Sequence, residues 1–92
     1  MSTNYTKDPA ELLDYSFDWS AWLAEVGDTI DRATVVPTEG LTAVGEPVVD
    51  GALVTQRVSG GALGSLCTVV CQITTASGLI AERSIYLTIA DR

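Results

Sequence analysis

The fold is decided by residues 66–75, which read Leu-Cys-Thr-Val-Val-Cys-Gln-Ile-Thr-Thr. Apolar or sulfur-bearing side chains stand at alternate positions of this stretch, namely Cys67, Val69, Cys71 and Ile73. A period of two, together with many β-branched residues, predicts a β-strand with one buried face. Both thiols then lie on that face.

The two cysteines of the chain are kept apart by this strand. Positions four apart on a strand are separated by roughly 13 Å, whereas a disulfide needs Cα atoms about 4.4–6.8 Å apart. We therefore expect Cys67 and Cys71 not to bridge each other and to act as small buried side chains. A disulfide to another chain and a reactive thiol are the alternatives.

The same alternation appears earlier, where residues 13–19 predict a strand with an aromatic inward face. Trp19, Trp22 and Leu23 follow at helical spacing, which predicts a short helical turn over residues 19–25. The candidate core and family-motif residues are Tyr15, Phe17, Trp19, Trp22, Leu23, Cys67, Val69, Cys71 and Ile73.

Further short strands are predicted between turn signals, over residues 29–36, 41–44, 48–49, 52–58 and 82–90. The fold class is therefore all-β, an immunoglobulin-like β-sandwich of about seven short strands with one short helical turn near residues 19–25. Residues 13–92 form this domain. Residues 1–12 are polar, contain Pro9, and predict an N-terminal arm whose deletion leaves the fold intact.

Negative charge is concentrated in the first half of the chain. The formal net charge is −7, and residues 8–50 contain ten of the twelve acidic residues against one base, Arg32. An acidic surface repels phosphate groups, so we expect neither nucleic acid nor a membrane as partner. A basic patch on another protein fits better, and the alternative is that the acids only keep the domain soluble.

The composition argues against catalysis and metal binding. The chain has no histidine, which removes the commonest general base and most zinc sites. Paired catalytic carboxylates need an enclosed cleft, for which a sandwich of 92 residues has little room. We expect no enzyme, no catalytic residue, no metal site and no cofactor. The sequence also contains no membrane-length apolar run and no signal-peptide pattern, which favours synthesis in a cytoplasm.

Two stretches resemble small tailed-bacteriophage virion structural proteins of the fiber-tail adaptor type. They are Leu13-Asp-Tyr-Ser-Phe-Asp-Trp-Ser-Ala-Trp-Leu23 followed by Gly27-Asp-Thr-Ile30, and Ser59-Gly-Gly61 with residues 67–75, Gly78 and Glu82-Arg-Ser84. The resemblance covers about residues 8–90. It implies a multi-copy virion protein, made in the host cytoplasm, that bridges larger proteins of the tail, neck, fiber or capsid.

A tail or neck adaptor that attaches fibers is thus the expected function. A capsid decoration protein on the phage head is one alternative, and a carbohydrate- or cell-surface-binding module is another. The candidate partner-binding residues lie in the arm and the first strand, namely Tyr5, Asp8, Glu11, Asp14 and Asp18.

Overall fold

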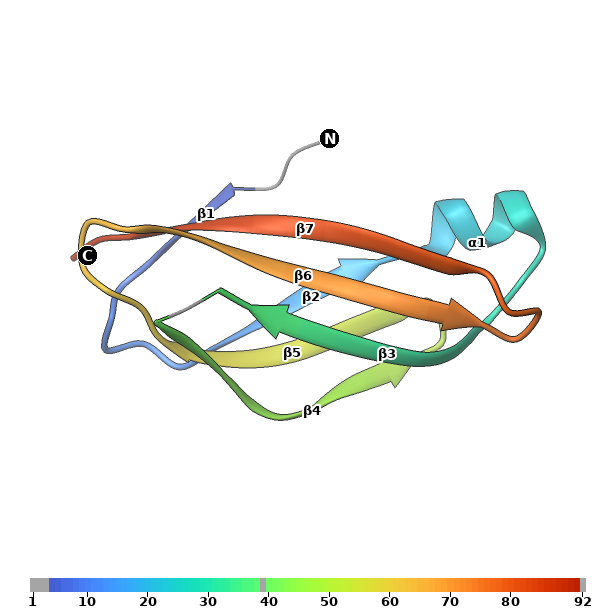
Figure 1. Ribbon diagram of the computed structural model, residues 1–92, viewed down its shortest axis with the longest axis horizontal. Helices are drawn as coiled ribbons and strands as arrows, with labels where there is room; N and C mark the ends of the chain where they lie inside the picture. The colour runs from blue at the N-terminus through green and yellow to red at the C-terminus, as the bar shows by residue number, and fades with distance from the viewer. Residues whose placement is uncertain (1–3, 39, 92) are drawn as a thin grey trace.

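The computed structural model describes residues 4–38 and 40–91. Within these residues the chain forms seven strands and one helix, arranged as two sheets that pack face to face (Figure 1). The elements are β1 (Asn4–Lys7), β2 (Leu13–Asp18), α1 (Ser20–Val26), β3 (Ile30–Pro37), β4 (Leu41–Asp50), β5 (Leu53–Gly60), β6 (Leu66–Thr75) and β7 (Ile80–Ile89). The all-β sandwich class is confirmed, and its immunoglobulin-like character stays a prediction.

In the part of the chain that the structure describes, a four-stranded sheet has the order β1-β7-β6-β3 and a three-stranded sheet has the order β2-β5-β4. Strand β1 runs parallel to β7, and the other paired strands are antiparallel. Strand β6 lies between β3 and β7. It therefore has a strand on both sides.

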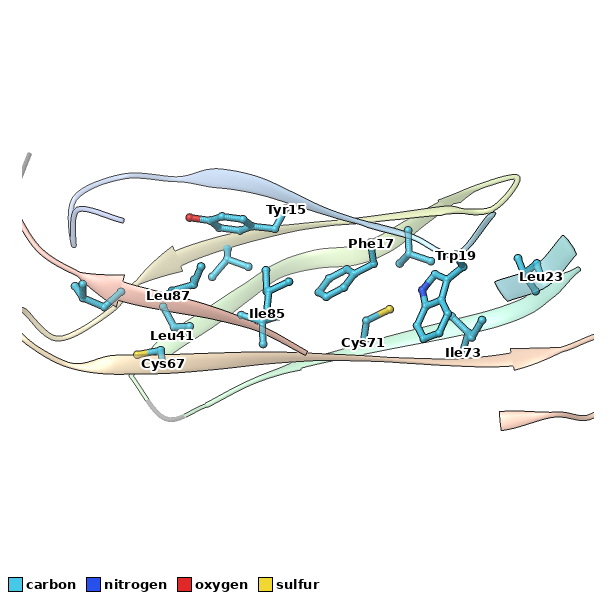
Figure 2. Close-up of a cluster of buried hydrophobic side chains, with 14 residues drawn as sticks. Tyr15, Phe17, Trp19, Leu23, Leu41, Cys67, Cys71, Ile73, Ile85 and Leu87 are labelled. Carbon is cyan, nitrogen blue, oxygen red and sulfur yellow. The ribbon is translucent and has the colours of Figure 1, made fainter. Parts of the chain in front are cut away.

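The core lies between the sheets and is built from alternate side chains of their strands. On β6 every second residue from Cys67 to Thr75 is buried, while the residues between them are half-buried. Phe17 reaches this layer from the opposite sheet (Figure 2), as do Val54 and Val58 of β5. Each large apolar side chain that is fully buried contributes about 1.5–3 kcal/mol. This alternation fixes the register of both sheets, because a slip by one residue would expose the buried set.

Helix α1 lies at one end of the sandwich (Figure 1) and follows Trp19. The Leu23 N–H donates to the Trp19 carbonyl at 2.9 Å, which closes the first turn. The helix ends at Gly27, whose φ of 66° is in the left-handed region that favours glycine. Leu23 is buried and Trp22 packs partly buried beside it. The predicted helical turn is thus confirmed as a helix of seven residues.

The first strand differs from the expectation for residues 1–12, of which residues 1–3 lie outside the described residues. Asn4–Lys7 is no detached arm but the edge strand of the four-stranded sheet, in register with Tyr86–Ile89. Lys7 is fully buried, and its Nζ donates to the carbonyls of Gly60 at 2.6 Å and Asp8 at 3.0 Å. A buried lysine held by main-chain carbonyls leaves no hydrophobic signal in a sequence. Deleting residues 1–12 therefore removes a strand.

Strand β4 also differs, because the sequence predicts two short strands where the structure has one. Its pairing with β5 shifts between Val44 and Val48, where a Gly-Glu-Pro sequence stands. The side-chain amide of buried Gln56 lies 3.3 Å from the Val44 carbonyl and 3.2 Å from the Gly45 carbonyl, which gives these irregular main-chain groups a donor. An irregular edge strand with a proline resists pairing with other chains.

Candidate docking surfaces

The outer face of the three-stranded sheet carries four acidic residues beside the exposed apolar side chains of Val44, Val48 and Leu53. On β2, Asp14 and Asp18 point outward because they alternate with the buried side chains of Tyr15 and Phe17. Across the sheet, Asp18 and Asp50 both pair with Leu53, so that two carboxylates flank one exposed leucine. We call this surface the acidic sheet face, and define it by Asp14, Asp18, Glu46 and Asp50.

One base, Arg57, stands on this face in the described residues. It forms an ion pair with Asp14, with 2.9 Å between Arg57 Nε and Asp14 Oδ1 and 3.2 Å between Nη2 and Oδ2. The hydrogen bond from Arg57 holds the pKa of Asp14 below its usual range. Because both side chains are about half exposed, the pair adds little stability. Its main effect is to fix the orientation of the two groups.

Asp18 is oriented by the start of the helix. Its Oδ1 accepts a hydrogen bond from the Ser20 N–H at 2.9 Å. Hydrogen bonds from Ser20 lower the pKa of Asp18, with a smaller contribution from the charge of Arg83. Asp18 is therefore ionised throughout the neutral and mildly acidic range.

The other candidate partner-binding residues lie elsewhere. Asp8 and Glu11 belong to the turn between β1 and β2, where the Asp8 N–H donates to Glu11 Oε1 at 2.8 Å. Tyr5 lies on β1 with its ring 5.2 Å from the ring of Tyr15. Asp14 and Asp18 thus lie on the acidic sheet face. Asp8 and Glu11 lie in one turn, and Tyr5 takes part in an aromatic contact. The five residues do not form a single cluster.

The opposite outer face, on the four-stranded sheet, consists mostly of threonine and other polar residues, with five apolar side chains among them. Val36 pairs with Val70, and Tyr86 pairs with Thr68, all on outward-facing positions. Exposed leucine and isoleucine side chains stand at the ends of the same face. We call it the apolar sheet face and define it by Val36, Leu66, Val70, Ile80 and Tyr86. Val36 and Val70 lie side by side, and adjacent apolar side chains on a surface are typical of interaction sites.

Arg83 closes the side of the sandwich next to α1, and the sequence analysis did not single it out. Its guanidinium lies 4.5 Å from the centre of the Trp19 ring and donates to the Asp18 carbonyl. The contact joins β7 to β2 across the two sheets. The signal in the sequence was slight, because an arginine among exposed positions of a strand is ordinary.

The candidate core residues lie together between the sheets. Tyr15, Phe17, Trp19 and Leu23 are buried, as are the four alternate residues of β6, and Trp22 is partly buried. Both thiols are free and buried. Burial raises the pKa of the Cys71 thiol, which the neighbouring Trp19 indole only partly opposes (Figure 2). A raised pKa and burial together make a thiol poorly reactive.

Within residues 4–38 and 40–91, no group of three or more His, Cys, Asp or Glu side chains is placed to hold a metal ion. None of the helices described has the length and apolarity needed to cross a membrane.

Comparison with known proteins identifies one family. A family model described as podophage GP4 fiber-tail adaptor protein gp77 matches residues 7–88. The match runs from the last residue of β1 into β7 and so spans both sheets. A search of curated proteins finds no match.

Proposed function

The chain belongs to the podophage GP4 fiber-tail adaptor protein family, and from this membership we propose that it is a non-catalytic virion protein that bridges larger virion proteins where fibers attach to the tail. A structural tail-adaptor role and a place in the phage particle follow from the family. The partners that it bridges, and its presence in several symmetric copies, are part of the proposal.

The bridging role is supported by the difference between the two outer faces. Because the sheets pack face to face, the acidic sheet face and the apolar sheet face point in opposite directions. A basic surface would be attracted to the first, and an apolar surface would pack on the second. One small domain can in this way contact two chemically different neighbours. We prefer the adaptor role to capsid decoration and carbohydrate binding because the family is named for a tail adaptor.

The role of the acidic sheet face is tested by reversing two of its charges. The double variant Glu46→Lys with Asp50→Lys replaces two acids by two bases. It therefore changes the net charge of this face by four units. The control, Glu25→Lys with Asp31→Lys, makes the same change at exposed positions of α1 and β3. Each variant is supplied from a plasmid during infection by phage that lack the gene, and its amount in purified particles is measured by mass spectrometry.

We expect incorporation of the first variant to fall by about tenfold and that of the control to stay near wild type, because opposed charges steer and hold docking partners. Circular dichroism checks that both variants fold. Normal incorporation of the first variant would remove the acidic sheet face from the proposal.

A further inference from the structure

Strand β7 is longer than the strand beside it. Its residues Tyr86–Ile89 pair with β1, but the strand begins at Ile80. In the part of the chain that the structure describes, no strand lies beside residues 80–85 on the β1 side. Figure 1 shows this half of β7 continuing past β1 toward the end that carries α1.

The main-chain groups on this free edge are identified by the hydrogen bonds at the other end of β7. The Ile89 N–H donates to the Ser65 carbonyl at 2.9 Å, toward β6, and the Ala90 N–H donates to the Lys7 carbonyl at 2.9 Å, toward β1. Successive residues of a strand direct their N–H and C=O groups to opposite sides. The main-chain groups of Glu82 and Ser84 therefore point to the free edge.

A groove runs beside this edge, between the two sheets. It has a volume of about 440 Å³, and its apolar lining includes Tyr5, Phe17 and Ile85. Alternate side chains of a strand added beside β7 would point into this groove, as those of β1 point toward the three-stranded sheet. Arg83 also lines the groove, where its guanidinium lies over Trp19 and donates to the Asp18 carbonyl.

We propose that residues 82–84 of β7 are a strand-addition site, at which an extended segment of another virion protein pairs with the four-stranded sheet and places an apolar side chain in the groove. The strand-addition site rests on the proposed docking function and specifies what kind of segment the partner contributes. The chain's own β1 shows that the edge of β7 accepts a parallel strand. The charged side chains of the groove are one acid and one base, Asp18 and Arg83, so its apolar residues select the side chain that enters it.

Hydrogen–deuterium exchange tests the site in the wild-type protein. The free protein and purified particles are compared by mass spectrometry with fragmentation that resolves single residues. We expect the amides of Glu82 and Ser84 to exchange quickly in the free protein and at least about tenfold more slowly in particles, because a ladder hydrogen bond protects each one. The amide of Leu87, which faces β6, is the internal control and changes little.

A variant tests the same hydrogen bonds in a different way. Ser84→Pro removes an outward N–H at an edge position, where proline is tolerated, whereas Ser84→Ala removes only the hydroxyl. We expect about tenfold less Ser84→Pro than Ser84→Ala protein in particles. Thermal unfolding of both variants shows whether the fold is kept. If Ser84→Pro does not fold, the exchange experiment still tests the site, because it uses the wild-type protein.

The outcomes separate this inference from the proposed function. Equal exchange of the Glu82 and Ser84 amides in free protein and in particles overturns the strand-addition site while leaving the adaptor role in place. Protection that already exists in the free protein also overturns it, since the edge is then filled by the chain itself or by a second copy. Absence of the wild-type chain from particles contradicts the proposed function instead.

Discussion

At the scale of single residues, Gly61 occupies a position with no room for a side chain. Gly61 has a φ of 108°, and a Cβ atom added there would lie 2.7 Å from Cδ1 of Ile89, which is fully buried. Gly64 has a φ of 86° with nothing within 4 Å of an added Cβ. The two glycines thus share an unusual backbone conformation and differ in the space around them.

Gly61→Ala is therefore expected to destabilise the fold more than Gly64→Ala. Both variants cost about 1–2 kcal/mol for the left-handed backbone, and Gly61→Ala adds roughly 1–3 kcal/mol for the clash with Ile89. Urea unfolding followed by tryptophan fluorescence measures both. Equal losses in the two variants would contradict the packing described for Gly61.

Individual residues also show what a sequence can and cannot reveal. The burial of Phe17, Val69 and Ile73 follows from alternation, because each belongs to a strand with one inward face. The burial of Lys7 does not, since its partners are carbonyls that only the folded chain brings near. The contact of Arg83 with Trp19 joins residues far apart in the sequence and has no local pattern.

At the scale of elements, the strands with strong alternation were placed correctly, whereas β1 and β4 were not. Strand β6 was predicted with the bounds that it has, because both of its neighbours require the same buried face. Strand β1 was missed because its residues are polar, and it is held by its pairing with β7 and by Lys7. Strand β4 was divided in two because Gly45 and Pro47 are typical of turns, although the strand continues past them.

Because β1 is a strand of the sheet, truncation of the N-terminus should lower the stability of the fold. Deleting residues 1–7 removes a strand and uncovers the edge of β7, including the buried side chains of Leu87 and Ile89. We expect a loss of about 2–5 kcal/mol in the free energy of unfolding, comparable to the loss of one or two large core side chains. Deleting residue Met1 alone is the control. A truncated protein as stable as wild type would show that β1 contributes no packing.

At the scale of the whole molecule, stability should depend on pH through exposed aspartates. Hydrogen bonds lower the pKa of Asp28, first from Ser77 and then from the Thr29 N–H, and the pKa values of Asp14 and Asp18 are lowered as well. A carboxyl with a lowered folded-state pKa contributes stability above its unfolded pKa, and this contribution is lost as the pH falls through the folded value.

We therefore expect the unfolding temperature to fall as the pH is lowered below about 4, the ordinary range of an aspartate pKa. Asp28→Asn should make this fall shallower, because it removes one of the titrating groups. Asp31→Asn, at an exposed position of β3, is the matched control. Thermal unfolding between pH 2 and pH 7 measures all three proteins, and a pH dependence unchanged by Asp28→Asn would contradict a role for the Asp28 hydrogen bonds.

We propose that this domain joins two neighbours at the tail of the phage, and its copy number in the particle tests that role most directly. Quantitative mass spectrometry of purified particles, normalised to the portal protein, counts its copies directly. The account predicts roughly six to a few dozen copies per particle, as the symmetry of a tail or neck dictates. Hundreds of copies would instead indicate a head decoration protein, and a particle without the chain would contradict the account.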